Sequence, residues 1–495
     1  MIPKSYDRMS RRGLLLSMAG LNPWLPLRGH ATPAGAPRPN IVVLLSDDMG
    51  WEQVGLNGGK EVRTPNIDRI AREGLKMSQF YVQPVCTPSR SCLLTGRYAW
   101  KTGTERRPTG SARQGMLRDE RTVAEALREA GYATWMVGKW HLGEWQAGHL
   151  PRARGFDHHY GHYGALIDSY THTRGGVLDW HRNGKPVVEE GYSTFPLAKE
   201  ASSLIARHDG KRPFFLYLPF NAVHGPHMAP PDYLKKYEHL GGGRGAQCRG
   251  AQRAQMECLD VAVGRVLQAI RDKGVDRQTL VVFLNDNGGP RVVGANGPYR
   301  GFKSHYHEGG IRVPAAARWP GQIPAGGSTD EMLHAIDLFP TLCRLAGAGI
   351  GKGLPLDGRD AWPTMTSRAS SPRSEIVHSL QVMRAGDWKF IEQGASYYEW
   401  TGQPLQLYNI REDPYEKQNL AAERPEIVSR LRERLAYYRQ FAREGEPEER
   451  IPDYPPVVYG EEENREYGES LREKIKALGA NEEAESPRAR QQRKK

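Results

Sequence analysis

Four short, largely apolar runs punctuate the chain, at residues 41–45, 132–137, 214–220 and 280–284. They are rich in β-branched and aromatic residues, and each ends abruptly in polar residues. Continuous apolar runs of this length are typical of strands that are covered on both faces of a parallel sheet. We therefore expect these runs to form the centre of one buried β-sheet.

Amphipathic segments alternate with the apolar runs. Apolar residues recur at helical spacing over residues 65–73, 122–130 and 252–273, and glycine follows the first two segments as a stop signal. Residues 150–164 contain His158, His159 and His162 without a zinc-type spacing, and we expect a loop that forms part of a pocket wall or ordinary surface. Strands that alternate with helices predict the α/β class.

The C-terminal part has a different pattern. Strand-like pieces at residues 388–391 and 405–409 precede an amphipathic helix over residues 425–441, which predicts a small sheet with a covering helix. The chain then becomes charged and rich in proline. We expect a large domain at residues 37–366, a smaller C-terminal subdomain at 367–443, and a charged, partly flexible tail at 444–495.

Residues 1–36 have the pattern of a targeting segment. Basic residues precede an interrupted apolar stretch, and small residues at the end offer a cleavage site. The segment Ser10–Leu15, with Arg11 and Arg12, resembles a twin-arginine export signal. The alternatives are an ordinary secretory signal or a retained anchor, although the stretch is short for a membrane span. We expect a bacterial periplasmic or secreted protein without a stable membrane span.

Composition narrows the choice of partner. The 495 residues carry a formal net charge of +12, which favours an anionic partner such as nucleic acid, a membrane surface or an acidic polysaccharide. The sequence contains no nucleic-acid-binding motif, so we expect no nucleic-acid partner.

Five cysteines are too few for a disulfide scaffold. Cys248 and Cys258 are near enough in sequence for a local bridge, and the sequence leaves open whether they are bridged or free.

Acidic and amide side chains follow two of the predicted strands. Asp47 and Asp48 come directly after residues 41–45, and Asp286 and Asn287 follow residues 280–284. The carboxyl ends of parallel strands meet at one edge of a sheet, so we expect these side chains to converge. Carboxylate and amide oxygens are the ligands of a hard divalent cation, although each pair read alone is an ordinary turn.

Cationic side chains follow the other two runs. Lys139 and His141 lie between glycines after residues 132–137, and His224 follows residues 214–220. Lys303 lies in a later glycine-rich loop. At the same sheet edge, these groups could surround one anion.

The segment Val85–Arg97 organises the rest of the chain. Cys86, Thr87 and Pro88 predict a loop that enters the first turn of a helix, where unpaired backbone N–H groups attract anions. Arg90 adds a permanent cation at the same place. A nucleophile at Cys86 would therefore face a stabilised oxyanion, whereas the alternative is a buried thiol beside a helix cap.

The pattern Cys86-x-Pro88-Ser89-Arg90, followed by Leu94-Thr95-Gly96-Arg97, resembles the signature of the type I sulfatases. The resemblance covers most of residues 40–420, and its central region looks most like arylsulfatase B, the N-acetylgalactosamine-4-sulfatase. It implies an alkaline-phosphatase-like sandwich with a large mixed, mostly parallel sheet between helices, and a smaller subdomain of antiparallel sheet and helix. It also implies that a formylglycine-generating or sulfatase-maturing enzyme converts Cys86 to formylglycine.

The resemblance also assigns roles to the residues at the strand ends. By position, one Ca²⁺ is held by Asp47, Asp48, Asp286, Asn287 and an oxygen of the group made from Cys86, while Arg90, Lys139, His141, His224 and Lys303 surround the sulfate. In the family scheme the calcium-bound hydrate of formylglycine attacks sulfur, His224 or Lys303 protonates the leaving alcohol, and His141 removes a proton as sulfate leaves.

The function that this implies is hydrolysis of a sulfate monoester, with a sulfated carbohydrate of the N-acetylgalactosamine-4-sulfate type as the expected substrate. Two alternatives remain open. A cationic crevice of this kind suits any tetrahedral anion, which allows a phosphate or phosphonate monoester hydrolase with the same fold. A non-catalytic binder of anionic polysaccharide would also retain the fold.

Overall fold

The computed structural model describes residues 38–105, 114–174, 177–241, 248–366, 369–398 and 404–447. The predicted export signal at residues 1–36 and the predicted tail from residue 448 onward lie outside these ranges. In the part of the chain that is described, no helix is both long enough and apolar enough to cross a membrane.

The predicted strands lie side by side in one mixed sheet, which has ten strands within the described residues. Its central strands, β11, β1, β10, β4 and β5, are all parallel, whereas β12, β8 and β9 introduce antiparallel pairs. In spatial order the strands are β13 (Gly327–Thr329), β2 (Leu75–Met77), β12 (Ala315–Arg318), β11 (Thr279–Asn285), β1 (Asn40–Ser46), β10 (Phe214–Pro219), β4 (Ala133–Lys139), β5 (His158–His162), β8 (His181–Arg182) and β9 (Lys185–Pro186).

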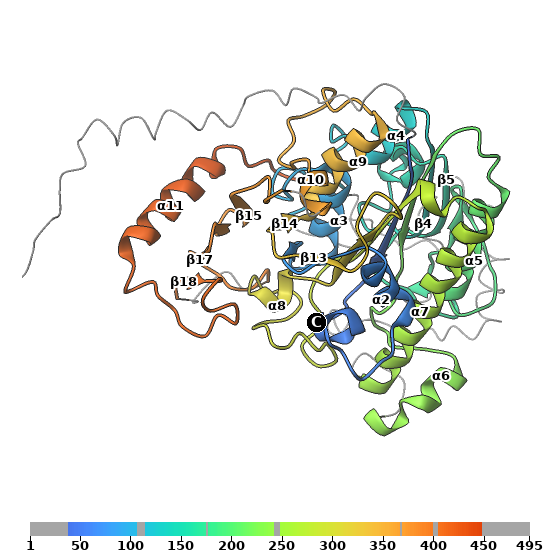
Figure 1. The fold of residues 1–495 in the computed structure, drawn as a ribbon, viewed down its shortest axis with the longest axis horizontal. Helices are drawn as coiled ribbons and strands as arrows, with labels where there is room; N and C mark the ends of the chain where they lie inside the picture. The colour runs from blue at the N-terminus through green and yellow to red at the C-terminus, as the bar shows by residue number, and fades with distance from the viewer. Residues whose placement is uncertain are drawn as a thin grey trace, which may run out of the picture. The chain divides into compact units, whose positions relative to one another are not determined.

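Helices cover both faces of this sheet (Figure 1). Along β1, alternate side chains point into two different cores, as the period of a strand requires. The core that contains Ile41 and Val43 is closed by α3 (Cys86–Thr95), α4 (Val123–Glu129) and α9 (Leu338–Ala346), and the core that contains Val42 and Leu44 is closed by α2 (Pro65–Arg72), α5 (Thr194–Arg207) and α7 (Arg249–Asp272).

The C-terminal part forms a second, four-stranded antiparallel sheet, with α11 (Pro425–Arg439) packed against it (Figure 1). Its strands are β15 (Glu375–Ser379), β16 (Val382–Ala385), β17 (Trp388–Ile391) and β18 (Gln406–Asn409). The predicted fold class is confirmed. The smaller elements are β3 (Phe80–Tyr81), β14 (Leu333–His334), β6 (Thr173–Arg174), β7 (Val177–Leu178), α6 (Pro231–Lys236), α8 (Glu308–Ile311) and α10 (Trp362–Met365).

One expectation about local structure is corrected, and one question that the sequence left open is answered. Residues 150–164 do not form a loop, because β5 occupies residues 158–162, and both His159 and His162 are fully buried there. Cys248 and Cys258 are both free thiols. Cys248 caps the N-terminus of α7 and Cys258 lies ten residues further along the same helix. A rise of 1.5 Å per residue therefore separates them by about 15 Å, more than a disulfide can span.

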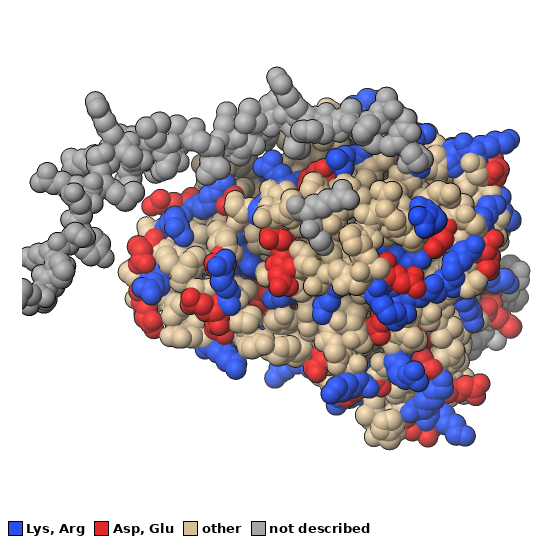
Figure 2. All heavy atoms as spheres, in the orientation of Figure 1, with Lys and Arg blue, Asp and Glu red and all other residues tan. Residues whose placement is uncertain are grey.

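Charged side chains of both signs are interleaved on the face drawn in Figure 2. This distribution indicates that the positive net charge of the chain is not spread as one large field over that face. Recognition of an anion is then decided by local clusters of charged side chains.

Candidate active site

The carboxyl ends of four neighbouring parallel strands carry the predicted site residues. Asp47 and Asp48 directly follow β1, and Asp286 directly follows β11, the neighbour of β1. Lys139 is the last residue of β4, which pairs with β10 on the other side of β1. The predicted convergence at one edge of the sheet is present in the structure.

Arg90 of α3 links three of these strand ends. Its side chain is fully buried and donates to Asp286 Oδ2 at 2.7 Å and to Asp47 Oδ2 at 3.1 Å, both from Nη2. Its Nη1 donates to the carbonyl oxygen of Lys139 at 3.0 Å. One guanidinium therefore bridges the carboxylates of Asp47 and Asp286. Arg90 therefore positions the site, and its expected contact with sulfate stays a prediction.

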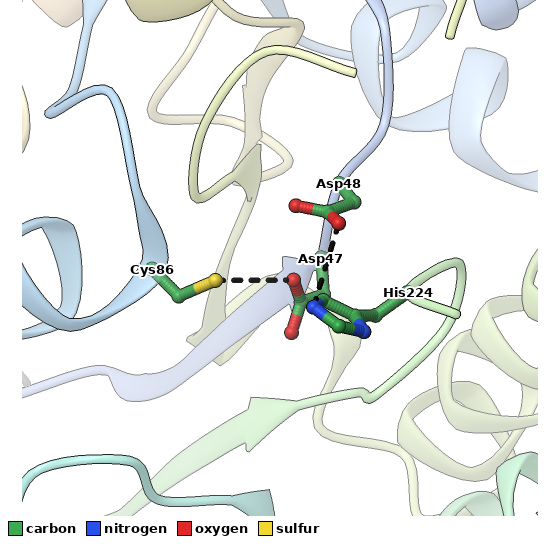
Figure 3. A group of neighbouring side chains, drawn as sticks. All are labelled: Asp47, Asp48, Cys86 and His224. Atoms are coloured by element: carbon green, nitrogen blue, oxygen red, sulfur yellow. Dashed lines mark hydrogen bonds and ion pairs between the residues drawn. The ribbon is translucent and has the colours of Figure 1, made fainter. Parts of the chain in front are cut away.

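Cys86 is the first residue of α3, and its Sγ lies 3.5 Å from Asp47 Oδ1 (Figure 3). The entry to this helix is held by Ser89, whose hydroxyl accepts from the N–H of Gln83 at 2.9 Å and donates to a nearby backbone carbonyl. Burial, together with the charge of Asp47, raises the pKa of the Cys86 thiol to about 12. An unmodified thiol here stays protonated near neutral pH and is a weak nucleophile.

Asp48 is the second acidic centre, and it contacts three predicted site residues. Lys303 Nζ lies 2.6 Å from its Oδ1, and His224 Nε2 lies 3.5 Å from its Oδ2 (Figure 3). Asn287 Nδ2 donates to Asp48 Oδ1 at 2.7 Å. Asp48 has a φ of 61°, a left-handed backbone conformation that is uncommon for a residue other than glycine.

Lys139 reaches Asp47 by a buried ion pair between its Nζ and Oδ2. The preceding Gly138 has a φ of 131°, and a Cβ there would lie 1.9 Å from the carbonyl oxygen of Pro219. Only glycine allows β4 and β10 to approach so closely at the site. His141, two residues beyond Lys139, is also buried, and its backbone N–H donates to the backbone carbonyl of Tyr163 at 2.9 Å.

The pKa values of the three carboxyl groups at the site are shifted in different directions. Burial alone raises the pKa of Asp47, but the charges of Lys139, His224 and Arg90 outweigh it, so the net pKa is lowered. The pKa of Asp48 is lowered in the same way, because Lys303 and His224 outweigh burial. Burial and the negative charge of Asp47 raise the pKa of Asp286 to about 6.

The donors of this cluster fit a hard divalent cation. Asp47, Asp48 and Asp286 supply buried carboxylate oxygens, and Asn287 Oδ1 is buried with no hydrogen-bond partner among the described residues. One ligand atom from each of Asp47, Asp48, Cys86 and His224 lies within 4.8 Å of the others. An oxygen-rich set of this charge is typical of calcium sites.

Two further histidines, His227 and His162, bear on the predicted site. His227 is not part of the cluster, since its Nδ1 lies 2.7 Å from Gln255 Oε1 on α7, which agrees with the choice of His224 over its neighbour. His162 was expected in a pocket wall or on ordinary surface, and its place on a strand beside Lys139 was not predicted. It ends β5, pairs in register with Lys139, and has a pKa lowered to about 3, above all by burial. The sequence signal was weak because β5 has no continuous apolar run.

Comparison with known proteins identifies the family. The sulfatase family model matches residues 39–348, which is more than half of the chain. The chain belongs to the sulfatase family. It is 33% identical over 473 residues to arylsulfatase J of Mus musculus, in an alignment that covers 84% of this chain and 78% of that protein. It is 34% identical over 419 residues to N-acetylgalactosamine-6-sulfatase of Canis lupus familiaris, with coverage of 78% and 75%.

Solved structures agree with this assignment. The crystal structure of Ps i-CgsB aligns with a TM-score of 0.75 and 30% identity, covering 82% of this chain and 94% of that one. The same protein is known in complex with k-i-k-neocarrahexaose. The sulfatase therefore has the predicted alkaline-phosphatase-like fold and is a sulfuric ester hydrolase. A particular closeness to arylsulfatase B stays a prediction.

Proposed function

We propose that this sulfatase removes sulfate from a sulfated carbohydrate, with formylglycine derived from Cys86 as the nucleophile and one calcium ion as cofactor. The observation that carries the proposal is the meeting of Asp47, Asp48 and Asp286 with Cys86 at one sheet edge. Two similar proteins support a sugar substrate. One is named N-acetylgalactosamine-6-sulfatase, and the other was solved in complex with k-i-k-neocarrahexaose. An N-acetylgalactosamine sulfate is our first choice.

When present, formylglycine at position 86 supplies an oxygen nucleophile and calcium supplies positive charge beside the sulfate. Asp47, Asp48, Asp286 and Asn287 would hold the ion, since all four carry buried oxygen atoms and follow the neighbouring strands β1 and β11. The ammonium groups of Lys139 and Lys303 lie beside the same carboxylates and would offset the negative charge of the sulfate.

The proton donor to the leaving alcohol was left open between His224 and Lys303. Burial lowers the pKa of Lys303, but the charge of Asp48 outweighs it and the net pKa is raised, so this side chain is protonated throughout the neutral range. Burial and the nearby charge of Lys303 lower the pKa of His224 to about 4, so the imidazole is neutral there. Both side chains contact Asp48, a proposed ligand of the ion, so the choice of proton donor stays open between them.

Mass spectrometry of the peptide that contains Cys86 tests the nucleophile. We expect the aldehyde form in active native enzyme, and a fully active enzyme with only an unmodified thiol would overturn the proposal. Removal of metal by a chelator should abolish sulfate release and lower the melting temperature, and Ca²⁺ should restore both. The thermal shift reports ion binding independently of activity.

A panel of substrates tests the substrate class. We expect sulfate release from N-acetylgalactosamine sulfates that bear the group at position 4 or 6, and much slower turnover of an aryl phosphate than of an aryl sulfate. Faster turnover of the phosphate would favour the alternative phosphate or phosphonate ester hydrolase.

We also propose that residues 1–36 direct export to the periplasm or to the medium. The basis is the pair Arg11 and Arg12 ahead of an apolar stretch. N-terminal sequencing of the protein from the periplasm should show that these residues have been removed, and full-length protein confined to the cytoplasm would contradict the proposal.

A further inference from the structure

A cavity of about 640 Å³ adjoins the loop that carries Lys303. Its walls come from residues 291–307, which follow β11, and from residues 395–398, which follow β17. Backbone hydrogen bonds hold the two walls together. The N–H of Tyr397 donates to the carbonyl of Ser304, and the N–H of Tyr306 donates to the carbonyl of Ala395.

The cavity is next to the candidate active site. Phe302 and Ser304 both line it, and Lys303 lies between them in the chain, so their Cα atoms are each about 4 Å from that of Lys303. The side chain of Lys303 contacts Asp48, and the N–H of Ser304 donates to the carbonyl of Pro84, two residues before Cys86. The same loop therefore forms a wall of the cavity and a wall of the site.

The chemistry of the cavity is cationic and aromatic. Arg291 and Arg300 line it, and none of the described residues that line it is acidic. The rings of Phe302 and His305 have their centroids 3.9 Å apart, and the Arg291 guanidinium lies 5.7 Å from the Phe302 ring centroid. Tyr398, on the opposite wall, is 54% exposed. This local excess of positive charge contrasts with the interleaved signs of the face in Figure 2.

These groups match one class of ligand. A guanidinium binds a sulfate or carboxylate through two parallel hydrogen bonds, and exposed aromatic rings offer flat apolar surface against which a sugar ring can pack. Arg300 already uses one of its nitrogens within the protein, because its Nη1 donates to Tyr408 Oη at 2.7 Å and to the carbonyl of Glu416 at 3.1 Å. Arg291 is exposed and is the better candidate for contact with a ligand.

We propose that this cavity binds the sugar unit next to the one that is desulfated, and that Arg291 selects substrates in which this neighbour carries its own sulfate or carboxylate. The inference rests on the proposed function and deepens it. The enzyme then prefers a glycan in which the neighbouring sugar unit is anionic to a glycan in which that unit is neutral.

The test compares Arg291→Gln with wild type on three substrates: an aryl sulfate, a disaccharide sulfated only on the scissile unit, and the same disaccharide with a second sulfate on its neighbour. We expect kcat/KM for the disulfated sugar to fall about tenfold through KM, with the other two substrates unchanged. Arg128→Gln removes one exposed arginine from α4 and is the matched control, with no expected effect.

Two results would overturn the inference: a wild-type enzyme that does not prefer the disulfated sugar, or an Arg291→Gln variant that affects both disaccharides equally or neither of them. If fully converted enzyme releases no sulfate from any of the three substrates, the proposed function fails instead. The cavity is then judged by calorimetry with the disulfated sugar and Cys86→Ala protein. Binding that is weakened about tenfold by Arg291→Gln supports the cavity, and unchanged or undetectable binding rejects it.

Discussion

Two buried clusters of charge in this sulfatase both pair lysine with carboxylates, and they have different properties. The strand-end cluster (Asp47, Asp48, Asp286, Asn287, Cys86, Arg90, Lys139, His224 and Lys303) is partly open, since the side chains of Lys303 and His224 are 20% and 16% exposed. The buried triad consists of Lys389, Glu308 and Glu416, and all three of its side chains are 0% exposed.

The charges of the triad are paired with one another inside the protein. Lys389 Nζ lies 3.1 Å from Glu308 Oε1 and 2.8 Å from Glu416 Oε1, and Tyr81 Oη donates to Glu308 at 2.7 Å. It joins β17 of the small sheet to α8, which follows the loop of Lys303. The strand-end cluster, by contrast, keeps a buried Asn287 oxygen that has neither a hydrogen bond nor an ion pair within the described part of the chain. Buried charge alone does not mark an active site, whereas access from solvent together with an unused ligand atom does.

The largest expected effect is on catalysis by the strand-end cluster. Cys86→Ala should lower sulfate release at least about 10³-fold, because it removes the nucleophile and its precursor. The melting temperature should change little, since a small side chain is lost. Cys92→Ala is the matched control, another buried cysteine of α3 that should keep activity within about threefold. Substantial turnover by the Cys86 variant would contradict the role of Cys86 as the precursor of the nucleophile.

The second effect is on stability, through the triad. Lys389→Met removes the cation that two buried carboxylates share and should lower the free energy of unfolding by about 3–5 kcal/mol, measured by denaturant titration. Lys352→Met breaks an exposed pair with Glu129 and should cost less than about 1 kcal/mol. If the Lys389 variant kept its stability and lost only activity, the triad would belong to the site.

A smaller effect is expected at the open side of the strand-end cluster. Lys303→Ala should lower kcat/KM about 10²-fold, because one preorganised charge beside the sulfate is lost. The loss of stability should be smaller than for Lys389→Met, since the removed group is 20% exposed and Asp48 keeps its contacts with His224 and Asn287. Lys236→Ala, at an exposed lysine of α6, serves as the control for loss of one charge. Equal kcat/KM values for the two variants would remove Lys303 from the proposed mechanism.

The smallest effect is a pH dependence of stability within the triad. Burial raises the pKa of Glu416 from its ordinary 4.5 to about 7, despite the opposing charge of Lys389. The folded state therefore holds this proton more tightly, and Glu416 makes the free energy of unfolding fall by about 1–3 kcal/mol as the pH rises from about 4.5 to 7. Denaturant titrations at pH 5 and 8 should show a shallower fall for Glu416→Gln. An identical fall in both proteins would refute this assignment.

Much of the fold and most of the candidate site could be predicted from local pattern. The apolar runs before Asp47 and Asp286 did become β1 and β11, because a strand buried on both faces needs an unbroken apolar run. The start of α3 at Cys86 followed from its loop and proline signals. Elements without such a local signature were missed, among them β5, β15, β16 and α5.

The sequence by itself determined which side chains stand at strand ends and that one cysteine begins a helix, since both depend on residues close together in the chain. Only the tertiary structure decided the strand order β11, β1, β10, β4, and with it that Arg90 bridges Asp47 and Asp286 and that Lys303 reaches Asp48. The physical reason is that these contacts join segments far apart in the chain, and their partners are set by packing of the whole sheet rather than by any local pattern.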